Sequence, residues 1–187
     1  GDDGPTHHGI FDLPLLRAVP DLVLMQPKDE AELAGMLASA VRWERPVVIR
    51  YPRGRGPGTP VPDQPVWLEP GRAEVIRPGL EVQIWALGDM IPIALQAATR
   101  LAEQGLSAGV VNARFIRPLD TVLLDEQARS TRVWANLENG VAAGGELPLG
   151  TIRLIEIIMH QLQQVGQGVA QDTADLPAGD FGGGRID

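Results

Sequence analysis

Val82-Gln83-Ile84-Trp85-Ala86-Leu87 is an apolar run that ends at Gly88, and it predicts a buried β-strand. Residues 91–104 fit a helix, because proline is tolerated in a first helical turn at Pro92 and glycine ends the pattern at Gly105. The pattern then predicts a strand at 107–112, a helix at 121–129 and a strand at 132–137. This alternating order indicates a parallel sheet covered by helices.

A similar unit is expected nearer the amino terminus. The apolar run Leu22 to Met25 is followed by Asp29, which can cap a helix, and by Glu32, which can complete a capping box. Residues 47–49 are typical of a strand that is buried on both faces. The predicted helix carries one apolar stripe, which consists of Leu33, Met36, Leu37, Ala40 and Val41. We expect this stripe to pack on another surface.

Proline and glycine dominate the segment between these two blocks, so we predict a stiff linker at residues 54–80. The predicted fold class is therefore α/β, with two α/β units that have mainly parallel sheets and are joined by this linker. The first unit is expected at residues 1–53 and the second at 81–165, with a helix from 151 to 165. Residues 166–187 show no apolar periodicity, and we expect a mobile tail.

The composition narrows the possible functions. The 187 residues are 44% apolar and carry a formal net charge of −8, and the scattered lysines and arginines argue against a nucleic-acid partner. Cysteine is absent, which excludes disulfides and thiolate metal sites. The longest candidate for a membrane helix, residues 152–159, is short and contains two charges, so no membrane partner is expected. The first residues do not fit a signal peptide, and the chain is expected to begin inside a loop.

Two arginines follow the strand predicted at residues 47–49, in the run Arg50-Tyr51-Pro52-Arg53-Gly54. Ligands of α/β sheets gather at the carboxyl ends of the strands, and the planar guanidinium group donates paired hydrogen bonds to phosphate. We therefore predict that Arg53 and Arg50 bind an anionic substrate. The alternative is that both are ordinary solvated or ion-paired residues at a strand end.

A second candidate lies in the run Asp3-Gly4-Pro5-Thr6-His7-His8-Gly9. Histidine titrates near neutral pH, and a neighbouring carboxylate fixes its tautomer, so His7 and Asp3 are candidates for proton transfer to a carbonyl oxygen. A metal site is a competing interpretation, although no further ligand has suitable spacing. A purely structural loop is the third.

Five runs, taken in order, resemble the 1-deoxy-D-xylulose-5-phosphate synthase family of transketolase-like enzymes. They are Asp3 to Leu13, Gln26 to Glu30, Arg50 to Gly54, Val111 to Asp120, and Glu138-Asn139. The resemblance covers residues 1 to about 145, and it implies the end of a pyrimidine-binding domain followed by a transketolase carboxyl-terminal domain. The sequence departs from the family pattern after Gly145, so this second domain is expected to be truncated or altered.

The resemblance implies a transferase that condenses pyruvate with glyceraldehyde 3-phosphate and releases CO2, the first step of non-mevalonate isoprenoid synthesis. It implies thiamine diphosphate and Mg²⁺ as cofactors and a homodimer in the cytoplasm. It also implies His7 as the active-site histidine, Asp3 as an acidic pocket residue and Arg53 as a ligand of the substrate phosphate. The family's cofactor motif would lie upstream of residue 1, so we assign no residue to the cofactor and expect the isolated chain to be an inactive carboxyl-terminal fragment.

Two alternatives remain open at this point. One is the beta subunit of a 2-oxo acid dehydrogenase, which shares both domains. The other is a non-catalytic module that pairs with another chain, because a half-domain exposes a sheet edge and the apolar stripe of the helix after Asp29. The synthase hypothesis requires His7 and Arg53 to converge on one phosphorylated aldehyde.

Overall fold

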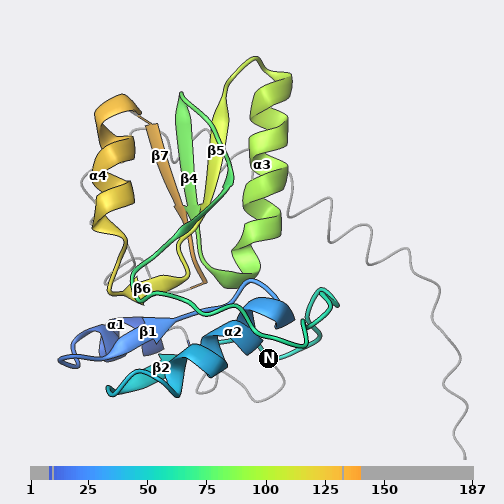
Figure 1. Ribbon diagram of the computed structural model, residues 1–187. Coiled ribbons are helices and arrows are strands. Elements are labelled where there is room, and N and C mark those ends of the chain that lie inside the picture. The colour runs from blue at the N-terminus through green and yellow to red at the C-terminus, as the bar shows by residue number, and fades with distance from the viewer. Residues whose placement is uncertain (1–8, 10, 132, 140–187) are drawn as a thin grey trace, which may run out of the picture.

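The computed structural model describes residue 9, residues 11–131 and residues 133–139 (Figure 1). Within this part of the chain, the helices and strands form two groups that lie against each other (Figure 1). None of the helices found in these residues is long and apolar enough to cross a membrane. The predictions of a helix at 151–165 and of a tail at 166–187 lie outside the described residues.

The second unit is a four-stranded sheet with the order β3-β5-β4-β7. Its elements are β3 (Glu74–Arg77), β4 (Val82–Ala86), the short 3₁₀ helix η2 (Gly88–Met90), α3 (Ile91–Glu103), β5 (Ala108–Asn112), α4 (Thr121–Ser130) and β7 (Val133–Leu137). β4 pairs in parallel with both β5 and β7, whereas β3 is antiparallel to β5. Helices α3 and α4 lie on opposite sides of the sheet (Figure 1). Ile84 of β4 packs in the cluster with α3, and its neighbour Trp85 packs in the cluster that includes α4.

The first unit has a three-stranded sheet with the order β2-β1-β6. Its elements are α1 (Asp12–Arg17), β1 (Val23–Met25), α2 (Glu30–Ala40), β2 (Val47–Ile49) and β6 (Phe115–Arg117). β1 is parallel to β2 and antiparallel to β6. As predicted, Asp29 caps α2, because its Oδ1 accepts the N–H of Glu32 at 2.8 Å. The Glu32 carboxylate accepts the N–H of Lys28, one residue before the cap, at 2.7 Å.

β6 belongs to the first sheet although it follows β5 of the second unit in the chain. The backbone turns between the two strands at Arg114, whose φ of 59° lies in the left-handed region. Phe115 is fully buried in a cluster with Met36 of α2. In the opposite direction, Leu24 of β1 packs with Trp85 of β4. The two units therefore share both a sheet and a hydrophobic core.

The α/β prediction is confirmed, and three of the five strand pairings among the described residues are parallel. One difference is β3, which lies inside the range predicted as a linker. The segment between Pro70 and Pro78 contains no proline and is long enough for a short edge strand.

The apolar stripe on α2 also differs from its prediction, because it does not pack as one face. Met36 is fully buried, but Leu37 is 54% exposed and Val41 is 89% exposed. Leu37 and Val41 are four residues apart and form one row along the helix, and Met36 lies on a neighbouring row. The row that contains Met36 faces β1 and β6, whereas the row of Leu37 and Val41 is rotated away from them.

Candidate active site

Arg50 lies directly after β2 and makes four hydrogen bonds to distant groups within the described part of the chain. Its Nε donates to Asp12 Oδ2 at 2.7 Å, and one terminal nitrogen donates to Gln26 Oε1 at 2.7 Å. The other terminal nitrogen donates to the carbonyl of Asn139 at 3.0 Å and to that of Gly9 at 3.4 Å. The Arg50 side chain is only 16% exposed, so it forms part of the interior of this edge.

Hydrogen bonds continue from Arg50 into the second unit. Gln26, which is fully buried after β1, donates from Nε2 to Asp89 Oδ1 at 3.0 Å. Asn139 donates from Nδ2 to both Asp89 oxygens, at 3.0 and 2.7 Å. The amide of Gln26 can have only this orientation, because its oxygen faces a donor and its nitrogen an acceptor. The carboxyl ends of β1, β2, β4 and β7 are therefore connected at one edge, where α/β proteins bind ligands.

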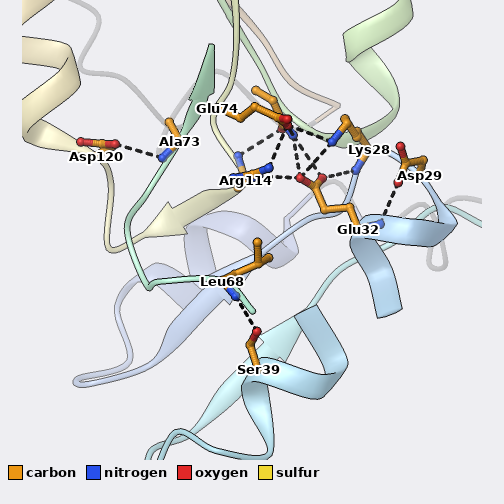
Figure 2. A network of polar contacts seen from close by, with 10 residues as sticks. Lys28, Asp29, Glu32, Ser39, Leu68, Ala73, Glu74, Arg114 and Asp120 are labelled. Atoms are coloured by element: carbon orange, nitrogen blue, oxygen red, sulfur yellow. Dashed lines mark hydrogen bonds and ion pairs between the residues drawn. The ribbon is translucent and has the colours of Figure 1, made fainter. Parts of the chain in front are cut away.

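A second polar network lies between the two units and consists of Lys28, Glu32, Glu74, Asn112 and Arg114 (Figure 2). Glu32 Oε1 accepts from Arg114 Nε at 2.6 Å, and the same carboxylate accepts from Asn112 Nδ2 at 2.9 and 3.1 Å. Glu74 Oε2 forms ion pairs with Lys28 Nζ and with a terminal nitrogen of Arg114, both at 2.9 Å. Two cations thus balance two carboxylates. Lys28 and Glu32 come from the first unit and the other three residues from the second, so the network holds the units together.

The pKa values of two members of this network reflect their pairing. Burial acts to lower the pKa of Lys28, but the charge of Glu32 and the hydrogen bond to Glu74 outweigh it and raise this pKa above 10.5. Burial acts to raise the pKa of Glu74, but the hydrogen bond from Lys28 and the charge of Arg114 hold it below 4.5. Both groups are therefore charged at neutral pH.

A cavity of about 250 Å³ opens between the start of α2, the loop after β2 and Asp89. Its polar lining includes Lys28, Asp29, Glu30, Tyr51, Arg55 and Asp89. The loop is held at its far end by Glu30, whose carboxylate accepts the N–H groups of Gly58 and Thr59 at 2.9 and 3.0 Å. Backbone N–H groups, first that of Glu30 itself and then that of Gly58, lower the pKa of this carboxyl. The cavity is therefore bordered by an ordered loop.

The predicted site residues fall in different places. Arg53 lies exposed in the loop after β2, and its neighbours Pro52 and Gly54 line the cavity. Arg50 lies behind the cavity edge, in the hydrogen bonds described above. His7 and Asp3 lie outside the described residues, so the predicted convergence of His7 and Arg53 remains a prediction.

Two residues that the structure brings to this edge were not predicted as site residues. Asp89 follows β4, and Gln26 follows β1, so both stand at the carboxyl end of a predicted strand. Their position at a strand end could have indicated a site residue, because the same position led to the prediction for Arg50. Asn139 follows β7, and its bonds to Asp89 bring it to the same edge.

Comparison with known proteins identifies the class of protein. The family model of the transketolase pyrimidine binding domain matches residues 1–58, and that of the transketolase C-terminal domain matches residues 71–147. The chain therefore belongs to the transketolase family. Within this family it is similar to 1-deoxy-D-xylulose-5-phosphate synthases, as the resemblance in the sequence indicates.

The synthase of Syntrophus aciditrophicus is 49% identical over 175 residues, which are 94% of this chain and 27% of that protein. The synthase of Heliobacterium modesticaldum is 48% identical over 145 residues, which are 78% of this chain and 22% of that protein. The chain thus spans about a quarter of the length of these relatives. A solved structure described as a split gene transketolase, inactive beta4 tetramer, superposes with a TM-score of 0.67 at 34% identity. That match covers 83% of this chain and 48% of the other.

Membership of this family implies the use of thiamine diphosphate by the complete enzyme. Among residues 9, 11–131 and 133–139, no group of three or more histidine, cysteine, aspartate or glutamate side chains is arranged to hold a metal ion. The polar groups described above order the strand ends and the loop beside the cavity.

Proposed function

We propose that the chain is part of a 1-deoxy-D-xylulose-5-phosphate synthase, which condenses pyruvate with glyceraldehyde 3-phosphate and releases CO2. The observation that carries this proposal is the 49% identity with the Syntrophus aciditrophicus synthase over 94% of this chain. The proposal includes a homodimeric, cytoplasmic, Mg²⁺-dependent enzyme of isoprenoid synthesis, with its cofactor motif upstream of residue 1. It places a first domain at residues 1–53 and a second domain at 81–165, and β3 of the intervening segment 54–80 pairs with the second domain.

In this proposal, Arg53 binds the phosphate of glyceraldehyde 3-phosphate at the edge of the cavity. Its exposure and its place between two lining residues support this role. His7 gives a proton to the aldehyde oxygen as the new carbon–carbon bond forms, and Asp3 fixes the orientation of the imidazole. The carbonyl of Gly9, two positions after His7 in the sequence, contacts Arg50 at 3.4 Å, which supports a site at this edge.

The test is to express the chain together with the remaining part of the Syntrophus aciditrophicus synthase and to measure CO2 release from pyruvate. We expect release to depend on glyceraldehyde 3-phosphate. Arg53→Gln should raise the KM for this aldehyde about 10- to 100-fold, because it loses a charge-assisted hydrogen bond. The same variant should leave the reaction of unphosphorylated glyceraldehyde unchanged. His7→Gln should lower kcat about 10²- to 10⁴-fold with either aldehyde.

Two outcomes would contradict the proposal. If the two-carbon unit is transferred to a lipoyl group and not to the phosphorylated aldehyde, the chain is part of a 2-oxo acid dehydrogenase. If Arg53→Gln changes the KM for both aldehydes equally, Arg53 does not bind the phosphate.

The solved relative described as an inactive tetramer supports a second expectation, that this chain alone is inactive and self-associates. The exposed side chains of Leu37 and Val41 on α2 are also consistent with association. Light scattering after size exclusion measures the mass of the isolated chain. A stable monomer, or synthase turnover by the chain alone, would contradict this expectation.

A further inference from the structure

The guanidinium group of Arg50 has little capacity left for a substrate. Arginine carries five N–H groups in a fixed plane. Its four hydrogen bonds go to Asp12, Gln26, Asn139 and Gly9. They occupy the Nε–H group, both N–H groups of one terminal nitrogen and one N–H group of the other. One N–H group remains, whereas paired recognition of a phosphate needs two that point the same way.

The charge of Arg50 is also already balanced. Asp12 Oδ2 lies 2.7 Å from Nε, and the Arg50 side chain is 16% exposed. A carboxylate at this distance opposes the attraction of a second anion, and partial burial strengthens that effect.

The acceptors of Arg50 come from three segments that lie far apart in the sequence. Asp12 and Gly9 belong to the start of α1 and the residues before it, Gln26 follows β1, and Asn139 follows β7. Arg50 itself follows β2. Through Gln26, the same contacts reach Asp89 after β4. One side chain thus determines how the strand ends of the two units are arranged around the candidate site.

We propose that Arg50 is a positioning residue, which holds these strand ends of both units in register and does not contact the substrate phosphate. This inference rests on the proposed function for its link to catalysis, because Arg50 orders the edge where the reaction would take place. Its structural part does not depend on that function. Lysine cannot replace arginine here, because a single ammonium group cannot reach four acceptors that surround a planar fork.

The first experiment measures hydrogen exchange of the 187-residue chain as wild type, Arg50→Lys and Arg72→Lys. Arg72 is the matched control, because it is 56% exposed and its ion pair with Glu69 is 3.8 Å long. In Arg50→Lys we expect about 10-fold faster exchange at Leu13 and Leu87, which lie at this edge, and a smaller increase at Val110 inside β5. Arg72→Lys should match the wild type at all three. Unchanged exchange at the edge in Arg50→Lys would overturn the proposal, whatever reaction the protein performs.

The second experiment separates positioning from phosphate binding in the reconstituted enzyme. A displaced catalytic edge lowers kcat, by about 10- to 100-fold, and leaves the KM for glyceraldehyde 3-phosphate within about threefold. Arg50→Lys should lower kcat equally with phosphorylated and unphosphorylated aldehyde. A rise in KM for the phosphorylated aldehyde alone would show that Arg50 is a phosphate ligand and would overturn the proposal. If the wild-type enzyme has no synthase activity, the proposed function fails, while the exchange result still decides the positioning role.

Discussion

Glu32 is the most buried carboxylate of the network between the units, with a side chain that is 3% exposed. A buried charge is costly unless it is fully hydrogen-bonded, and Glu32 meets this condition. It accepts hydrogen bonds from the side chains of Arg114, Asn112 and Lys28 and from the backbone of Lys28 (Figure 2). Its removal would leave two partly buried cations to share Glu74 alone.

We therefore expect Glu32→Gln to lower the free energy of unfolding by about 3 to 5 kcal/mol, the usual cost of breaking a buried pair by removing one partner. Urea denaturation followed by circular dichroism measures this change. The control is Glu69→Gln, because Glu69 is 78% exposed and pairs with Arg72 at 3.8 Å. That substitution should change stability by less than about 0.5 kcal/mol. A similar small effect for both variants would show that the network contributes little.

The sequence indicated the edge of the site but not the partners of its residues. Arg50 and Arg53 could be found because they follow a strand, where ligands bind in α/β folds. The acceptors of Arg50 are 24 residues away at Gln26 and 38 residues away at Asp12. Such contacts depend on how the two units dock, and apolar periodicity carries no information about docking. For this reason the sequence could not show that the Arg50 side chain is already bound.

At the scale of elements, two aspartates begin helices in the same way but with different further contacts. Asp29 caps α2 by accepting the N–H of Glu32 at 2.8 Å. Asp120 caps α4 by accepting the N–H of Leu123 at 3.0 Å, and its other oxygen accepts the N–H of Ala73, just before β3, also at 3.0 Å. Asp120 therefore connects a helix to the edge strand, and Figure 2 shows its contact with Ala73.

We expect Asp29→Ala to cost about 1 kcal/mol of folding stability, the usual value for a lost cap. Asp120→Ala should cost about 2 to 3 kcal/mol, because it also leaves the N–H of Ala73 without its acceptor. Thermal and urea unfolding measure both changes. Asp125→Ala, at an exposed position inside α4, is the control and should lie within about 0.5 kcal/mol of the wild type. Equal losses for Asp29→Ala and Asp120→Ala would show that the bond to Ala73 does not stabilise the fold.

Elements with a continuous apolar run were predictable, even where they were short. Helix α3 was predicted at 91–104 and is observed at 91–103, so it ends one residue earlier than predicted. Strand β2 matches its prediction of 47–49. β3 and β6 were missed because each contains only two consecutive apolar residues, so neither forms an apolar run like those of β1 and β2. In addition, β6 is a strand only because β1 of the other unit is its partner, and this pairing links residues about 90 positions apart.

At the scale of the whole molecule, the two units do not have separate interiors. Phe115 follows the second unit's β5 in the chain but is buried with Met36 of α2, and Leu24 of β1 is buried with Trp85 of β4. Surfaces that pack this closely cannot separate without exposing apolar side chains to water. We infer that the units unfold together, although the sequence predicted two units connected by a linker.

Two core substitutions, one in each unit's cluster, test this inference. Phe115→Ala removes a fully buried ring from the cluster of the first unit, and Leu101→Ala removes a side chain of α3 that is 5% exposed from the cluster of the second. Each should cost about 2 to 5 kcal/mol. If unfolding is cooperative, each variant lowers the protection of backbone amides by the same free energy in β1 and in β5, as native-state hydrogen exchange measures. If each variant weakens only the unit that contains it, the shared core does not couple them.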